Sequence, residues 1–111
     1  MKIIRNPVFT APVKVMVPSD GGQREQQFTA RFRAMTLSEQ AEFDTSSANG
    51  TNEMLRSIVI GWDGLTDEDG EAFEFSSANL GTLIDLAYVR FALSRAYFDA
   101  TSGVRAAKRG N

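Results

Sequence analysis

The feature that most constrains the fold is a pair of alternating segments separated by turn-forming residues. Residues 13–17 place a valine at every second position, which in a strand puts all three on one face. Residues 28–33 alternate in the same way, with Phe28, Ala30 and Phe32 on one face. Between them, residues 18–22 read Pro-Ser-Asp-Gly-Gly, which is typical of a turn. The pattern predicts a β-hairpin with one apolar face that a helical layer must cover.

Two helices are expected directly after this hairpin. Thr36 and Glu39 have the spacing of a capping box, which predicts a helix running through residues 41–43. Residues 46–50 are small and polar and are expected to form a loop. Thr51 or Asn52 is then expected to cap a second helix, whose apolar stripe comprises Leu55, Ile58, Val59 and Trp62.

Residues 63–103 are expected to form an acidic loop followed by further helices. Residues 63–71 are acidic and rich in turn formers, and residues 72–75 resemble a short strand. Ser76 or Ser77 is expected to cap a helix containing Leu80, Leu83 and Ile84. A final helix is expected from Tyr88 to about Ala100, with Gly103 as its stop signal.

The order of these elements predicts an α+β domain, with an N-terminal β-hairpin followed by a cluster of three to four α-helices. A chain of 111 residues has room for one domain. We expect an irregular arm or an edge segment over residues 1–12, a single domain over 13–103 and a basic flexible tail over 104–111.

The absence of two residue types removes most catalytic chemistry. The sequence contains no cysteine and no histidine, which excludes disulfides, thiolate metal sites, cysteine nucleophiles and the commonest general base. If Gly70 is placed at the invariant glycine of a calcium-binding EF-hand loop, Leu65 and Ser76 fall at its first and last ligand positions. Two principal ligands are then missing, so the acidic loop does not match a calcium site. No pair of opposed carboxylates and no activated serine is recognisable. We therefore expect a protein that is not an enzyme and has no metal or cofactor.

Charge is unevenly distributed along the chain, although the net charge is only −2. Residues 1–33 sum to +4, residues 34–79 to −9 and residues 80–111 to +3. The segments either compensate one another within one domain or form faces of opposite sign suited to head-to-tail self-association. A pI near 5.1 argues against nucleic-acid binding, and no apolar stretch approaches the length of a membrane span.

The last helix carries more aromatic side chains than one core-facing stripe requires. Tyr88, Phe91, Arg95 and Phe98 follow one helical stripe, and Val89, Leu93, Ala96 and Tyr97 follow the neighbouring one. Such a helix is either central or uses one stripe at an interface with a partner. Tyrosine and arginine are the side chains expected to anchor such an interface. The candidate partner-binding residues are Trp62, Tyr88, Arg90, Phe91, Arg95 and Tyr97.

Two segments of the chain resemble a known family. Residues 13–32, with VPSDGG and then FTARF, look like the start of small tail assembly chaperones of long-tailed (siphovirus-type) bacteriophages. Residues 54–103 are similar to that family's most recognisable segment, through the runs IGWDGL, FS followed by NL, YVR and AY. Ala87 departs from the family pattern, where a proline is expected, and its presence would allow a continuous helix in place of a break.

The resemblance implies a non-enzymatic function in virion assembly. Such chaperones bind the long helical tape measure protein, keep it soluble and help recruit tail tube protein. They form homo-oligomers, act in the host bacterial cytoplasm and are absent from the mature virion. The alternatives are a structural virion component, such as a small tail or head-tail connector subunit, and a small phage regulatory binding protein.

Overall fold

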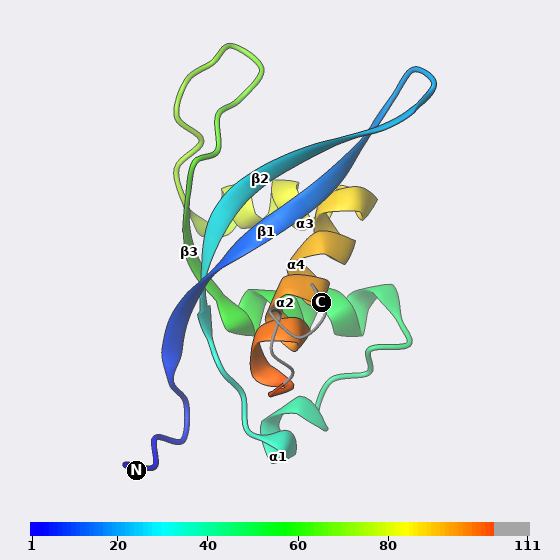
Figure 1. The fold of residues 1–111 in the computed structure, drawn as a ribbon. Coiled ribbons are helices and arrows are strands. Elements are labelled where there is room, and N and C mark those ends of the chain that lie inside the picture. Colours follow the sequence, from blue (N-terminus) through cyan, green and yellow to red (C-terminus); the bar gives the residue numbers. More distant parts are fainter. Residues whose placement is uncertain (104–111) are drawn as a thin grey trace, which may run out of the picture.

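A computed structural model describes residues 1–103, so the tail expected over 104–111 lies outside the described residues. The chain forms an α+β domain, which confirms the expected fold class, and Figure 1 shows its arrangement. In chain order the elements are β1 (Val8–Ser19), β2 (Gly22–Arg33), α1 (Leu37–Gln40), α2 (Ala48–Ile58), β3 (Val59–Asp63), α3 (Ser77–Ile84) and α4 (Ala87–Thr101).

The three strands form one antiparallel sheet in the order β1-β2-β3. β1 and β2 pair along their whole length, with Ser19 opposite Gly22 at the tip of the hairpin. Gly21, between them, has a φ of +80°, a conformation that only glycine adopts without strain. The predicted hairpin and its turn are therefore confirmed, and both strands extend beyond the predicted segments.

The helices α2, α3 and α4 cover one face of this sheet (Figure 1). The alternation predicted for the hairpin decides which face that is, because the valines and the phenylalanines at alternate positions are the buried ones. The core combines them with the inner faces of the helices. Its buried members include Val13, Val15, Phe28, Ala30, Phe32, Met54, Leu55, Ile58, Leu80, Leu83, Ile84, Val89, Ala92 and Leu93.

β1 begins at Val8, inside the segment 1–12 for which an irregular arm was one expectation. Residues 8–12 pair with β2 although Pro12 lies among them, so the irregular arm is wrong for this part and the alternative of an edge segment is confirmed. Pro12 is tolerated because β1 is an edge strand, in which every second residue directs its backbone nitrogen away from the neighbouring strand and so needs no N–H for the sheet.

The first two helices keep their capping chemistry but not all their predicted bounds. Thr36 and Glu39 form the expected capping box, yet α1 ends at Gln40 rather than running through residues 41–43. Ser47, not Thr51 or Asn52, caps α2 by accepting a hydrogen bond from the amide of Gly50. The predicted polar loop therefore ends at Ser47, because a side-chain oxygen there satisfies an N-terminal amide that the helix leaves unpaired.

Residues 59–63 form β3 instead of the end of a helix. Val59 and Trp62 are buried as predicted, but they lie opposite Phe32 and Ala30 on β2. The spacing of the apolar residues fits both a helix and a strand with an irregularity, and the register shifts between Arg31 and Phe32. Pairing with β2 favours the strand over the helix, because the backbone N–H and C=O groups along that edge of β2 need hydrogen-bond partners and β3 supplies them.

The C-terminal helices follow the predictions with two exceptions. Ser76 caps α3, α4 spans the expected residues, and Gly103 follows it with a φ of +80°. The helix is not continuous across Ala87, because α3 ends at Ile84 and a new helix starts after Leu86. The run expected as a short strand at residues 72–75 contributes a single bridge between Thr66 and Ala72. Among residues 1–103, no helix has the length and apolar content to cross a membrane.

Candidate protein-binding site

Three of the six candidate residues hold the fold together. Arg90 extends from α4 to α2, where its guanidinium donates hydrogen bonds to the side-chain oxygen of Asn52 and the carbonyl of Ala48. It also donates to the carbonyl of Ile84, the last residue of α3, at 3.2 Å. Arg90 thus joins three helices, and its donor groups are engaged within the chain rather than directed at a partner.

Trp62 is largely buried beneath the loop that follows β3. Its indole nitrogen donates to the carbonyl of Phe73 at 2.7 Å, and its ring lies parallel to that of Phe73 at 5.9 Å. The ring of Phe75 contacts it edge-on at 5.0 Å. Because Trp62 retains only 9 % of its surface, its prediction as a partner contact is wrong: it anchors residues 73–75 to the sheet.

Tyr97 is 1 % exposed and belongs to the core. Its ring contacts those of Phe32 and Phe98 edge-on, at 5.6 Å and 5.1 Å, and lies 6.3 Å from that of Phe9 at an interplanar angle of 30°. Its hydroxyl accepts a hydrogen bond from the amide of Met35 at 2.8 Å. The prediction that Tyr97 contacts a partner is wrong, because burial leaves it almost no accessible surface.

The other three candidates, Tyr88, Phe91 and Arg95, come together along a surface groove between α4 and the hairpin. Tyr88 is half-buried, whereas Phe91 retains 66 % of its surface although it is a large apolar side chain. The groove has a volume of about 710 Å³. Of the aromatic stripe that the sequence places beside the core stripe of this helix, Phe91 and Arg95 are exposed, whereas Tyr88 and Phe98 are partly buried against the core.

The hairpin supplies a wall of the groove that sequence reasoning did not find. Met16 lines it and is 42 % exposed, and Lys14 and Glu25 lie beside it. A signal for this was present, because Met16 is an apolar residue on the otherwise polar face of the first predicted strand. The remaining lining residues are Gln23, Ala87, Ala92 and Asp99.

Charges of both signs surround the apolar floor of the groove. Lys14 and Glu25 come from the hairpin, and Arg95 and Asp99 come from α4. Nε of Arg95 lies 3.8 Å from Oδ2 of Asp99, and both side chains are more than half exposed, so this pair contributes little to stability. An apolar floor with mixed charges around it suits another polypeptide rather than a highly charged polymer.

The acidic loop forms a turn that one of its own carboxylates closes. Oδ1 of Asp67 accepts hydrogen bonds from the amides of Asp69 and Glu71, at 2.9 Å and 3.0 Å. Gly70 follows with a φ of +82°. Within residues 1–103, no three acidic side chains converge as they would around a metal ion.

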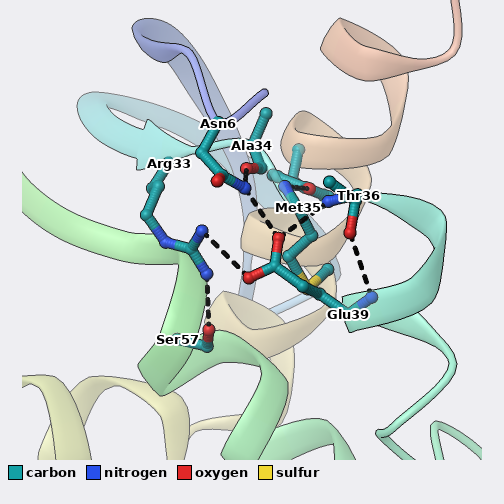
Figure 2. A network of polar contacts seen from close by, with 8 residues as sticks. Asn6, Arg33, Ala34, Met35, Thr36, Glu39 and Ser57 are labelled. Atoms are coloured by element: carbon teal, nitrogen blue, oxygen red, sulfur yellow. Dashed lines mark hydrogen bonds and ion pairs between the residues drawn. The ribbon is translucent and has the colours of Figure 1, made fainter. Parts of the chain in front are cut away.

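A second polar cluster ties the N-terminal segment to the body of the protein (Figure 2). Oε1 of Glu39 accepts hydrogen bonds from the side chain of Asn6 at 2.6 Å and the amide of Thr36 at 2.9 Å. Oε2 of Glu39 accepts one from Arg33 at 3.3 Å, and Arg33 also donates to the hydroxyl of Ser57. One carboxylate therefore links the N-terminal segment to β2 and α1, and through Arg33 to α2.

This cluster makes the stability of the fold depend on pH. The backbone amide of Thr36, the side chain of Asn6 and Arg33 hold the pKa of Glu39 below its ordinary value of 4.5. Because the folded pKa is the lower one, the stabilisation is complete above about pH 4.5 and is lost as the pH falls towards the folded pKa. Urea unfolding should show that Glu39→Gln lowers the free energy of unfolding more at pH 7 than at pH 3.5. Glu42→Gln, outside the cluster, is the control, and an equal effect of Glu39→Gln at both pH values would contradict this role.

Comparison of the chain with protein-family models, with curated proteins and with solved structures found no significant match.

Proposed function

We propose that this protein is a tail assembly chaperone of a long-tailed bacteriophage, acting in the host bacterial cytoplasm. Its groove binds a helical segment of the tape measure protein and keeps that protein soluble while tail tube protein is recruited. The chain works as a homo-oligomer, has no catalytic role and is absent from the mature virion.

The observation that carries this proposal is the exposed side chain of Phe91, which lines the groove beside the partly buried Tyr88. Phe91 and Tyr88 stand on α4 beside Met16 of the hairpin. An amphipathic helix binds such a surface by placing its apolar face on the floor and its polar side chains among the surrounding charges. The exposed apolar segments of a long helical protein are shielded from aggregation in this way. The resemblance of residues 13–32 and 54–103 to tail assembly chaperones supplies the identity of the partner.

Binding to the tape measure protein is expected to depend on Phe91. We expect Phe91→Ala to weaken the complex by at least about tenfold, because large side chains at the centre of an interface commonly carry this much binding energy. The measurement is co-purification with the tape measure protein, the product of the very long helix-rich reading frame that a chaperone gene should precede, followed by titration calorimetry. Circular dichroism should be unchanged, because most of the surface of Phe91 is already exposed to water.

Ile60→Thr is the matched control for this experiment. Ile60 is 38 % exposed, but it lies on β3 and does not line the groove. Equal binding by wild type and Phe91→Ala would contradict the proposed site. Mass spectrometry of purified virions separates the proposal from its main rival, because a structural tail or connector subunit would be present in them.

A further inference from the structure

The outer edge of β1 carries backbone groups that no strand within residues 1–103 pairs with. The amide of Ala34 donates to the carbonyl of Pro7 at 2.8 Å, one residue before the ladder between β1 and β2 begins at Val8. Hydrogen-bonded positions alternate along an antiparallel strand, so the odd-numbered residues of β1 bond to β2. The even-numbered residues therefore direct their N–H and C=O groups away from the sheet.

Two prolines limit the stretch of this edge that can pair with another strand. Pro12 and Pro18 lie at even-numbered positions, where the sheet itself needs no N–H but an added strand would. Between them, Lys14 and Met16 are the even-numbered residues that keep an outward N–H as well as an outward C=O. The edge is therefore open to a short added strand, whereas the prolines prevent a long one from pairing.

This open stretch of the edge borders the groove, because Lys14 and Met16 both line it. The helix α4 packs against β1 and forms the opposite wall with Tyr88 and Phe91 (Figure 1). Side chains alternate between two directions along a strand, so every second side chain of an added strand would face these two aromatic residues. Free backbone groups on one wall and an apolar helix on the other suit an extended segment.

Charges at the two ends of the open stretch have opposite signs. Glu25 lies opposite Met16, on the side of the hairpin tip, and Lys14 lies two residues nearer the start of β1. Neither Glu25 nor Lys14 forms an ion pair within residues 1–103, so both charges are free to meet a ligand. A segment antiparallel to β1 places its N-terminal end beside Glu25 and its C-terminal end beside Lys14. Charge complementarity therefore favours a basic N-terminal end and an acidic C-terminal end.

We propose that the groove binds an extended segment of a partner protein, which adds to the free edge of β1 as an antiparallel strand at Lys14 and Met16. Pairing at these two residues provides about four hydrogen bonds, because each hydrogen-bonded pair exchanges two. Alternate side chains of the segment are apolar and pack on Tyr88 and Phe91, so main-chain bonds supply affinity and side chains supply specificity. This ligand differs in conformation from a tape measure helix and competes with it for the groove. The inference does not rest on the proposed chaperone function.

The test selects binders of the full chain from a library of random peptides and measures their affinity by titration calorimetry. Selected peptides should carry apolar residues at every second position, a basic N-terminal end and an acidic C-terminal end. Lys14→Pro removes one outward N–H and should leave the fold intact, as judged by circular dichroism, because Pro12 and Pro18 occupy equivalent positions. It should weaken binding by at least about tenfold relative to Lys14→Ala, which loses the same side chain but keeps the N–H. Thr10→Pro, at an even-numbered position outside the groove, should bind like wild type.

Methylation of the backbone nitrogens of a selected peptide gives a result that does not depend on the folding of any variant. Methyl groups on the alternate nitrogens that face β1 should abolish binding, whereas methyl groups on the other set should leave it unchanged. Equal effects of the two sets would overturn the proposal. So would apolar residues at helical spacing in the selected peptides, or a Lys14→Pro variant that binds like Lys14→Ala. None of these results bears on binding to a tape measure protein, which the Phe91→Ala titration measures separately.

Discussion

Replacing Tyr97 with alanine is expected to lower the free energy of unfolding by about 3–5 kcal/mol, the usual range for removing a buried aromatic side chain. Tyr97 is 1 % exposed and its ring contacts Phe9, Phe32 and Phe98, which belong to β1, β2 and α4. The substitution leaves a cavity where the last helix meets the hairpin. It also leaves the amide of Met35 without the hydroxyl that accepts its hydrogen bond. Since small domains have a total stability of about 5–15 kcal/mol, much of it would be lost.

Two matched variants separate the contributions of the ring and the hydroxyl. Tyr97→Phe keeps the ring contacts and removes only the acceptor, so we expect a loss of about 1–3 kcal/mol. Phe91→Ala removes an aromatic side chain from the same helix, but Phe91 is 66 % exposed, so its effect on stability should be below about 1 kcal/mol. Urea denaturation measures all three. A Tyr97→Ala variant no less stable than Phe91→Ala would contradict the assignment of Tyr97 to the core.

The second large effect is expected at Gly50, on the first turn of α2. A Cβ added there would lie 1.8 Å from the backbone oxygen of Asp44, which is far inside van der Waals contact. The loop before α2 would have to move, together with the cap that Ser47 provides to the amide of Gly50. We expect Gly50→Ala to lower the free energy of unfolding by about 1–3 kcal/mol, although alanine favours a helix more than glycine does.

Gly81, in α3, provides the matched control for Gly50. A Cβ at Gly81 would lie 2.5 Å from a terminal nitrogen of Arg56, the free end of a flexible side chain. Arg56 can turn away at the expense of its exposed hydrogen bonds to Ser77, and alanine gains about 1 kcal/mol of helix propensity over glycine. Thermal unfolding should show Gly81→Ala to be neutral or stabilising. Equal losses of stability for Gly50→Ala and Gly81→Ala would contradict the role assigned to the backbone contact at Gly50.

Local patterns predicted the elements whose determinants lie close together in the sequence. The hairpin followed from alternation around a turn, and the caps of α1 and α3 followed from side chains that bond to amides three residues away. The prediction failed at Val59–Asp63, where the pattern fits a helix and the pairing with β2 makes a strand. That pairing depends on residues about thirty positions earlier in the chain, which no local pattern includes.

The candidate site, too, was predicted only where local sequence patterns determine it. The sequence correctly indicated that α4 carries a second apolar stripe, but it treated Tyr88, Phe91 and Tyr97 alike as partner contacts. Tyr97 faces Phe32 and the amide of Met35, whereas Phe91 faces solvent. Which side of the helix meets the sheet depends on how the helix is rotated over the hairpin, and helical spacing alone does not specify that.

The sequence by itself determined that this chain forms an α+β domain in which one face of a hairpin is covered by helices, because strand alternation and capping act over a few residues. Only the tertiary structure decided which aromatic side chains are accessible, that Arg90 is used to join three helices, and that Met16 shares a groove with Phe91. The physical reason is that burial and grooves arise from the packing of distant elements, whose relative orientation is set by the sum of all their contacts.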